Sequence, residues 1–448
     1  MYKWEAIKVG DLGDIKTGKT PKTSKKENYG GNIPFLTPSD DMSVKYVINT
    51  IKHITEIGLN EVKNVLLPQN SVCVSCIGSD LGKVVITTVP TVTNQQINSI
   101  IVDTENYNVD FCYYLMLQLG KILNYHSKTS TAVPIINKNS FSNYDILVPE
   151  LKIQEKIANI LSPIDEKIAI NNAINNNLEQ QAMALFRNKF INNINTNHTT
   201  CKAEEYFDIS IGKTPPRKET EWFSRTDGIK WVSISDMGNC GMYISDSSEY
   251  ITSSAIDKYN IKIVPDNTVI LSFKLTVGRV AITDGKMATN EAIAHFKTND
   301  KRINEYLYCY LKSFNYQTMG STSSIATAVN SKIIKAMPFI VPTNEEIDRF
   351  HNIVNPMFNK IKLNQTENVR LTQLRDTLLP KLMSGEIDVS NVKIDEKFDG
   401  SSTDKLSFSY IYIVIYEPFI IIIVIIIVGV NYEKTVYYII ILFYFLYL

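Results

Sequence analysis

The sequence predicts an α+β protein in which two mixed α/β globular domains alternate with two long helices. Four short blocks of the first half return in the same order in the second half, which indicates an internal duplication. Each half also ends in a stretch whose apolar residues recur at alternating steps of four and three, as in a helix that packs along one face against another helix. We therefore predict a pseudo-twofold arrangement whose two long helices pack as an antiparallel coiled coil.

The repeated blocks are recognised by their order and spacing. Residues 14–21 (DIKTGKTP) return as residues 208–215 (DISIGKTP), 194 positions later. The other three blocks recur 196 positions later: residues 33–40 as 229–236, 82–87 as 278–283 and 93–97 (TNQQI) as 289–293 (TNEAI).

Within each copy, short strands are predicted to dominate. Runs rich in β-branched and aromatic residues are separated by Gly, Pro, Asn and Asp turn signals. In the first half these runs are residues 33–36, 71–77, 83–87 and 97–102. A short helix is predicted at 110–119 and at 303–311, and Pro149 and Pro342 each precede a long helix.

These elements give a five-part organisation. Gly385 is predicted to end the second long helix. The predicted parts are a first domain at 1–149, a central helix at 150–192, a second domain at 193–342, a C-terminal helix at 343–387, and a linker with an apolar low-complexity tail at 388–448.

The two helices carry matching seams of nine residues. The first is Ile157, Leu161, Ile164, Ile168, Asn171, Asn175, Leu178, Ala182 and Leu185, and the second, 193 positions later (350 − 157), is Phe350, Val354, Met357, Ile361, Asn364, Asn368, Leu371, Arg375 and Leu378. A core-facing Asn weakens a coiled coil but fixes its register. Since Asn171 and Asn364 are each the fifth of nine, we predict that they lie opposite each other and that their contact fixes the register.

Composition excludes several classes of function. The chain of 448 residues has 46 basic and 46 acidic residues, so any DNA or lipid must be bound by local patches. Its six cysteines have no disulfide spacing, and Cys73 and Cys76 should lie on opposite faces of a strand, which disfavours a metal or redox site. The N-terminus lacks the apolar core of a signal peptide, and this favours a cytoplasmic protein.

The C-terminal tail is unusually apolar. Residues 411–430 and 436–448 are almost wholly Ile, Val, Tyr, Phe and Leu. Because Glu417 and Pro418 interrupt the first run, the pattern favours an appended, aggregation-prone segment over a membrane anchor, which stays the alternative.

A phosphate-binding loop is rejected. Residues 13–20 match the pattern G-x-x-x-x-G-K-[ST], in which a helix begins at the Lys. However, Pro21 disfavours helical geometry at Thr20, and the second copy has Phe207 in place of Gly13.

The same block is better interpreted as a DNA-facing loop. Basic and hydroxyl side chains gather there in both copies and could contact phosphates. The candidates are Lys19, Thr20, Lys22 and Lys25 in the first copy and Lys213, Thr214, Arg217 and Lys218 in the second. A basic loop is often only solvated surface, but its recurrence favours binding.

Base reading requires side chains that form paired hydrogen bonds, chiefly Asn or Gln with adenine and Arg or Lys with guanine. Candidates at matched positions are Lys83, Asn94, Gln95, Gln96, Arg279 and Asn290. The alternative is that the Asn and Gln side chains cap turns. Positions that differ between the copies, such as Gln96 and Ala292, are where two half-sites could differ.

No catalytic set emerges from the sequence. The five histidines are scattered, no amino-methylation block is present, and no Gly-rich loop follows a strand as a cofactor site would require. We therefore expect no catalytic residue, metal ligand or cofactor of the chain's own.

The ordered blocks, the proline before each long helix and the closing residues 378–387 (LLPKLMSGEI) resemble the specificity subunit of type I restriction-modification systems, over residues 1 to 392. The resemblance implies two target-recognition domains, each reading one half of a split site in double-stranded DNA, and two helices that act as a spacer. It also implies two methyltransferase subunits and restriction subunits as partners, which would use S-adenosylmethionine, ATP and magnesium. A helix of about 40 residues is about 60 Å long, more than one turn of B-DNA.

A second hypothesis is a scaffold or inactive remnant of such a subunit. On that reading the aberrant tail, possibly associated with a membrane, would prevent assembly with the partners.

Overall fold

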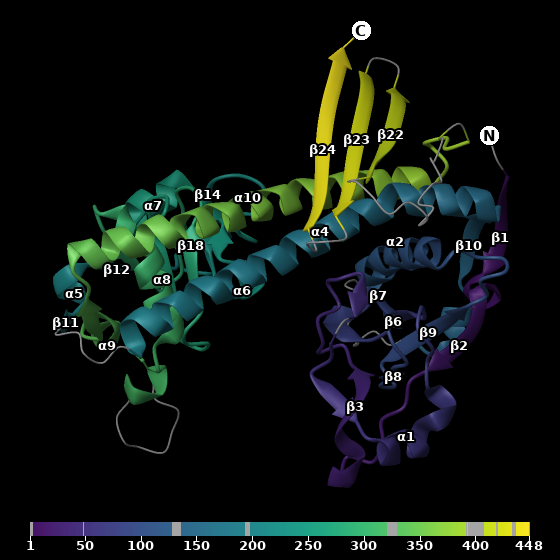
Figure 1. Ribbon diagram of the computed structural model, residues 1–448, viewed down its shortest axis with the longest axis horizontal. Helices are drawn as coiled ribbons and strands as arrows, with labels where there is room; N and C mark the ends of the chain where they lie inside the picture. The colour runs from purple at the N-terminus through teal and green to yellow at the C-terminus, as the bar shows by residue number, and fades with distance from the viewer. Residues whose placement is uncertain are drawn as a thin grey trace. The chain divides into compact units, whose positions relative to one another are not determined.

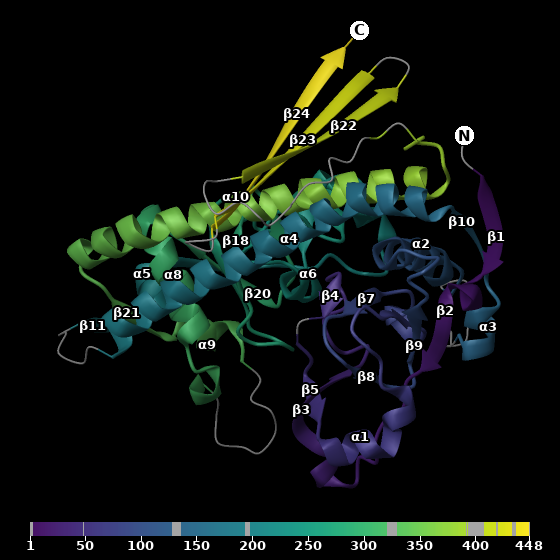
Figure 2. The same cartoon turned by 45° about the vertical axis from the view of Figure 1, so that its right-hand side comes forward.

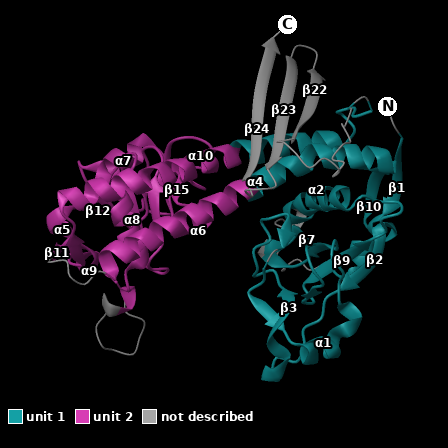
Figure 3. Ribbon diagram, in the orientation of Figure 1, with its two compact units in different colours: residues 1–169, 370–448 teal, residues 170–369 magenta. Residues whose placement is uncertain are grey.

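The computed structural model describes residues 3–47, 49–127, 136–192, 198–319, 329–390 and 392, together with three strands between 407 and 447. The chain forms two compact units, which Figure 3 shows in different colours. Unit 1 contains residues 1–169 and 370–448, and unit 2 contains residues 170–369. The unit boundary falls inside both long helices, so each unit has its own pair of helix halves.

The part of unit 1 before the long helices contains three sheets. The five-stranded sheet has the order β2 (Gly13–Thr17), β9 (Ile97–Val102), β6 (Val72–Ser75), β7 (Val84–Thr87), β4 (Tyr46–Val47). A three-stranded sheet has the order β5 (Lys52–Ile54), β3 (Tyr29–Leu36), β8 (Val92–Thr93). A two-stranded sheet pairs β1 (Trp4–Lys8) with β10 (Asp145–Pro149). The helices are α1 (Glu56–Val62), α2 (Val109–Ser127) and α3 (Lys138–Ser142).

Unit 2 repeats this strand order. Its five-stranded sheet runs β12 (Asp208–Ile211), β20 (Ile293–Lys297), β17 (Val269–Ser272), β18 (Val280–Thr283), β15 (Tyr243–Ile244). A four-stranded sheet has the order β13 (Phe223–Ser224), β16 (Tyr250–Ile251), β14 (Ile229–Val232), β19 (Ala288–Thr289). A two-stranded sheet pairs β11 (Thr199–Lys202) with β21 (Pro338–Val341). The helices are α5 (Ala203–Tyr206), α6 (Ile234–Asn239), α7 (Ser253–Tyr259), α8 (Asn304–Ser313) and α9 (Ser331–Lys335).

The two sheets that matter for the repeated blocks are mixed in both units. In the five-stranded sheets β4 pairs in parallel with β7, and β15 pairs in parallel with β18. In the smaller sheets β3 is parallel to β8, and β14 is parallel to β19. Every other neighbour in these four sheets is antiparallel, so the class predicted from sequence, α+β, agrees with the structure.

The predicted short elements are largely present. The run 97–102 is strand β9, whereas the run 71–77 narrows to Val72–Ser75. Helix α2 continues to Ser127, beyond the predicted end at 119, because its further turns bury Leu123 against the unit 1 core. In both views of the molecule α2 lies between the five-stranded sheet and the long helices (Figures 1 and 2).

Each unit has its own hydrophobic core, in which a sheet face, a short helix and two long-helix halves meet. In unit 1 Phe111 and Tyr114 of α2 pack with Ile157 and Leu378. Cys76 belongs to this core, whereas Cys73 is buried in a separate cluster with Leu36. The two cysteines thus lie on opposite faces of the sheet, as the alternation of a strand predicts.

The long helices begin where the prolines predicted. Helix α4 (Leu151–Phe186) starts two residues after Pro149, and α10 (Asn344–Met383) starts two residues after Pro342. A capping box begins α10, because the Thr343 hydroxyl accepts from Glu346 N at 3.3 Å and the Glu346 carboxylate accepts from Thr343 N at 2.9 Å.

The end of α10 also follows its sequence signal. Gly385 has φ +75°, and a Cβ at that position would lie 2.6 Å from Nε1 of Trp4. Glycine therefore ends this helix for both a conformational and a packing reason.

The predicted seams are buried or half-buried along both helices, with one exception. Leu185 is 37% exposed, and the adjacent Phe186 is 1% exposed in its place. An α-helix drifts about 20° per heptad from a strict seven-residue repeat. By the ninth seam position this drift has moved the buried face to the next residue.

The tail contains three antiparallel strands, β22 (Ser407–Glu417), β23 (Ile420–Asn431) and β24 (Val436–Tyr447). The greater part of the predicted linker, residues 393–406, lies outside the described residues. Within the described part of the chain, no helix combines the length and the apolar composition needed to cross a bilayer.

Candidate nucleic-acid interface

Two of the repeated blocks meet in unit 1. After β2 the chain runs through residues 18–21 without regular structure, alongside the connection between β8 and β9. Gly18 N donates to Ile97 O at 3.1 Å, and Lys19 N donates to Thr93 O at 2.9 Å. A Cβ on Gly18 would lie 2.2 Å from Asn94 O, so glycine is required by this close approach.

Unit 2 has the same junction. Gly212 N donates to Ile293 O at 3.1 Å, and Lys213 N donates to Thr289 O at 2.9 Å. A Cβ on Gly212 would lie 2.1 Å from Asn290 O. Since residues 18–21 and 212–215 are not helical, neither loop can present a helix N-terminus to a phosphate, which agrees with rejecting the P-loop match.

The TN blocks form matched turns. Asn94 Oδ1 accepts from Gln96 N at 3.1 Å, and Asn290 Oδ1 accepts from Ala292 N at 3.1 Å. Asn94 Nδ2 also donates to Gln96 Oε1 at 3.0 Å. The turn-capping alternative therefore describes what the side chains of Asn94 and Asn290 do in this structure.

The tips of the two turns are Gln95 and Glu291, and both side chains are exposed. Each is held by the threonine of the GKT loop, which is residues 18–20 in unit 1 and 212–214 in unit 2. Thr20 Oγ1 donates to Gln95 Oε1 at 2.7 Å. In unit 2 the Thr214 hydroxyl donates to the Glu291 carboxylate. The junction thus joins Thr20 to Gln95 and Thr214 to Glu291 with the same connectivity.

The basic side chains of the first loop fall into two groups. Lys25 forms an ion pair with Glu61 over 2.8 Å, and this contact raises the pKa of Lys25. Hydrogen bonds from Lys25 and the Lys22 backbone lower the pKa of Glu61 to about 2. Among the described residues no side-chain hydrogen bond or ion pair engages Lys19, Lys22 or Lys26, so these ammonium groups are available to a ligand.

In the second loop an arginine is held by aromatic rings. The Arg217 guanidinium lies 4.3 Å from the Phe223 ring centroid and 4.5 Å from that of Trp231, and it pairs with Glu249 over 2.8 Å. Lys213 Nζ donates to Tyr259 O at 2.6 Å. Lys218 has no such partner within the described residues, and it is the counterpart of the available lysines of the first loop.

Two further candidates are engaged within the fold. Lys83 forms an ion pair with Asp80 over 2.7 Å. Arg279 Nη1 donates to Ile234 O at 2.6 Å and lies so close to Gly238 that a Cβ there would be 2.4 Å away.

Sequence reasoning did not identify the acidic partners of the two loops. Glu61 is 36 residues from Lys25, and Glu249 is 32 residues from Arg217, so no local pattern connects them. Glu291 could have been found, because the alignment of TNQQI with TNEAI places it opposite Gln95.

The register asparagines form different pairs from the predicted one. Asn171 Nδ2 donates to Asn368 Oδ1 at 2.8 Å, and Asn364 Nδ2 donates to Asn175 Oδ1 at 2.8 Å. Asn171 and Asn364 therefore pair with Asn368 and Asn175 and not with each other: the paired numbers sum to 539 (171 + 368, 175 + 364), whereas the predicted pairing has a sum of 535 (171 + 364).

In this register asparagines lie level with asparagines. The sum of 539 also places Leu178 level with Ile361 in the unit 2 core, whereas a sum of 535 would place Asn175 level with Lys360. The match of like side chains is incomplete, because the sum of 539 places Ile164 level with Arg375.

In unit 1 a buried polar network joins the globular part to the long helices. Lys45 Nζ contacts Asp110 at 2.8 Å and Ser162 Oγ at 2.7 Å. Tyr114 OH donates to Asp165 at 2.6 Å, and Arg375 pairs with the other oxygen of Asp165 at 2.8 Å. Because buried polar groups are costly unless paired, this network fixes the α2 face on the helices.

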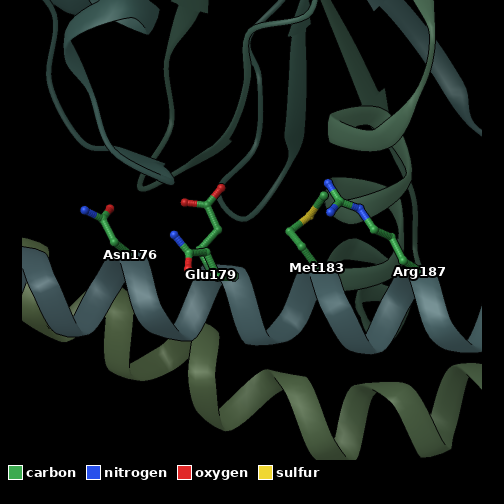
Figure 4. A pocket seen from close by; sticks show the side chains of 5 residues that line it. Asn176, Glu179, Met183 and Arg187 are labelled. Carbon is green, nitrogen blue, oxygen red and sulfur yellow. The ribbon is translucent and has the colours of Figure 1, made fainter. Parts of the chain in front are cut away.

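A polar pocket of about 440 Å³ lies on the unit 2 part of α4, and Figure 4 shows its side chains along one side of that helix. It is lined by Asn176, Glu179, Gln180, Met183 and Arg187. Glu179 accepts from Tyr308 OH at 2.7 Å and pairs with Lys312 over 3.3 Å. In the described part of the chain, no group of three or more His, Cys, Asp or Glu could hold a metal ion.

The two modules share the order of the five-stranded sheet, and each sets a loop with basic side chains against a polar turn, as expected of a protein with two nucleic-acid-binding surfaces. Comparisons with known proteins identify the family. The model of the type I restriction modification DNA specificity domain matches residues 1–180 and 196–373. The chain therefore belongs to the family of type I restriction-modification specificity subunits.

Individual relatives agree with this assignment. The chain is 27% identical to the MjaIX specificity subunit of Methanocaldococcus jannaschii, covering 87% of this chain and 94% of that protein. It is 35% identical to the HindI specificity subunit of Haemophilus influenzae, covering 58% of this chain and 72% of that protein. A type I S subunit structure from M. genitalium has the same fold, with a TM-score of 0.51, 16% identity and coverage of 85% and 96%.

Proposed function

We propose that this chain is the DNA-reading subunit of a type I restriction-modification complex. Each unit carries one target-recognition domain, residues 1–149 and 193–342, which reads one half of a bipartite site in double-stranded DNA. The observation that carries this proposal is the junction of the GKT loop with the TN turn, which both units build with the same backbone hydrogen bonds. Two domains that each recognise one half-site would each need such a surface.

The two long helices are proposed to pack as an antiparallel coiled coil that sets the spacing between the half-sites. The hydrogen bond from Asn171 to Asn368 and the one from Asn364 to Asn175 are related by the repeat, since 364 − 171 and 368 − 175 are both 193. This relation supports a pseudo-twofold axis between the helices. A polar register pair of this kind resists sliding of one helix along the other.

Catalysis is proposed to lie in the partner subunits. Two methyltransferase subunits would bind this chain and use S-adenosylmethionine, and restriction subunits would use ATP and magnesium. The chain itself would hold no cofactor and would act in the cytoplasm, where chromosomal DNA is accessible.

Methylome sequencing tests the proposal. The full chain is expressed with its methyltransferase subunit in a host that lacks other methyltransferases. We expect one methylated bipartite motif with a fixed spacer, and the same motif after removal of residues 393–448. A complex that forms but methylates no motif would refute the proposal, and a complex that forms only after the truncation would support the inactive-remnant alternative.

A further inference from the structure

The two turn tips present different chemistry on one backbone frame. In each unit the Asn of the TN block accepts from the N–H two residues later, and the N–H three residues later donates to the Asn carbonyl, at 3.2 Å for Ile97 and 3.3 Å for Ile293. Gln95 and Glu291 therefore occupy the same place in the two turns.

The frame also limits how each tip side chain can turn. Both residues are exposed, and each accepts a hydrogen bond from a threonine hydroxyl, Thr20 or Thr214, of the adjoining loop. A side chain held at its base and near its end loses little further entropy when it meets a ligand. Such preorganisation suits a reading contact.

A carboxylate at this place needs an explanation if the surface faces DNA. Although partial burial acts to raise it, the pKa of Glu291 is lowered by hydrogen bonds from Thr214 and its own backbone N–H, and by the charges of Lys274 and Arg217. Glu291 is thus ionised at neutral pH. A carboxylate repels phosphate, so at a DNA-facing position it must meet a hydrogen-bond donor on a base.

We infer that Gln95 and Glu291 are specificity-determining side chains, with Gln95 reading an adenine in the unit 1 half-site and Glu291 accepting from the amino group of a cytosine in the unit 2 half-site. This inference rests on the proposed function and adds the base that each module selects.

Hydrogen-bond chemistry selects these bases. With one lone pair of Gln95 Oε1 occupied by Thr20, the amide keeps a donor and an acceptor, which match N7 and the N6 amino group of adenine. The Glu291 carboxylate offers only acceptors. Guanine and thymine present acceptor oxygens in the major groove, and adenine places N7 beside its amino group, so cytosine is the base without an opposing acceptor.

The test is the methylated motif of variants in the complete complex. The wild-type motif is determined first, so failure of the proposed function appears as no motif at all. Glu291→Gln should change or relax one C·G position in one half-site and leave the other half unchanged. Gln95→Glu should act on one A·T position in the opposite half-site. Each loss of discrimination should be about 5- to 150-fold.

Glu204→Gln is the control, because Glu204 is also an exposed acidic residue of unit 2 but lies on α5 and not at the turn tip. Its motif should equal that of the wild type. If Glu291→Gln does not assemble, Thr214→Val removes only the hydroxyl that holds the carboxylate, and it should weaken discrimination at the same position.

Two results would overturn the inference. One is an unchanged motif in all the variants at both turn tips. The other is a uniform gain in affinity for every sequence with Glu291→Gln, which would mean that the carboxylate only offsets neighbouring positive charge.

Discussion

The side-chain amide of Asn171 donates to Oδ1 of Asn368 at 2.8 Å, and the internal repeat converts this hydrogen bond into the one from Asn364 to Asn175. The donors match in burial as well, since Asn171 and Asn364 are each 1% exposed. The polar centre of the helix pair therefore contains two repeat-related bonds and not one central pair. Asn171 also donates to Glu367 at 2.8 Å, and Asn368 donates to Asn172 at 2.8 Å.

The repeat relation predicts that substitutions at Asn171 and Asn364 both destabilise the helix pair. Asn171→Ala and Asn364→Ala should each lower the free energy of unfolding by about 1 to 3 kcal/mol, because each removes a hydrogen bond from the half-buried Asn368 or Asn175. The loss should be the larger at Asn171, which also donates to Glu367. Urea unfolding of the purified chain measures this. Asn177→Ala, at an exposed position of the same helix, is the control and should have little effect. A loss at one of Asn171 and Asn364 with none at the other would contradict the repeat relation.

The ion pair between Arg375 and Asp165 predicts a large loss when one partner is removed. Arg375→Met leaves the Asp165 carboxylate buried, with a side-chain exposure of only 6%, and should cost about 3 to 5 kcal/mol. Replacing both partners together with the hydroxyl that donates to Asp165, in the variant Arg375→Met, Asp165→Leu, Tyr114→Phe, should recover most of this loss. Hydrogen exchange of the α2 segment reports the change within unit 1.

Arg302→Met serves as the matched control for that experiment. Arg302 pairs with Asp300 and Asp348, but these side chains are 38% and 48% exposed, so its removal should have a much smaller effect on stability. An equal cost for both arginines would show that burial of the Asp165 pair has no special role.

The two groups of lysines in the first loop predict different salt effects on DNA binding. Lys22→Ala should weaken binding to all sequences and reduce the slope of log affinity against log salt by about 1, as expected for one lost phosphate contact. Lys25→Ala should change the slope little, because Glu61 already neutralises Lys25. Titrations of the assembled complex at several salt concentrations measure both. Equal slope changes would contradict the assignment.

Buried His295 predicts acid sensitivity of unit 2. Its ring lies between Ser210 Oγ at 3.1 Å and Thr289 Oγ1 at 2.7 Å, and burial together with Lys297 lowers its pKa from 6.5 to about 3. Because folding lowers this pKa, the stabilising contribution is complete above pH 6.5 and is lost as the pH falls from 6.5 toward 3, by up to about 1.4 kcal/mol per pH unit.

Urea unfolding followed by tryptophan fluorescence between pH 7.5 and pH 4.5 measures the effect, since Trp222 and Trp231 lie in unit 2. His295→Gln removes the titrating group and should flatten this part of the pH profile. The matched position of unit 1 is Ser99 (295 − 196). Because serine does not titrate, this prediction concerns unit 2 alone. A profile that is unchanged by His295→Gln would refute the assignment.

Local sequence signals predicted those features of the fold that depend on neighbouring residues. The prolines at 149 and 342 placed the starts of the long helices, and Gly385 placed the end of the second, because these residues restrict their own backbone. The prediction of the buried helix face was less accurate, because this face depends on packing against distant residues. At the end of the first seam Phe186 is buried in place of the predicted Leu185.

The sequence by itself determined that the chain is a duplicated protein and that GKT and TN blocks recur in each half, since a repeat is a property of residue order. Only the tertiary structure decided which of the loop lysines are free, because Glu61 reaches Lys25 from a distant helix. It also decided the helix register, because the bonds from Asn171 to Asn368 and from Asn364 to Asn175 depend on three-dimensional packing, which counting seam positions cannot measure.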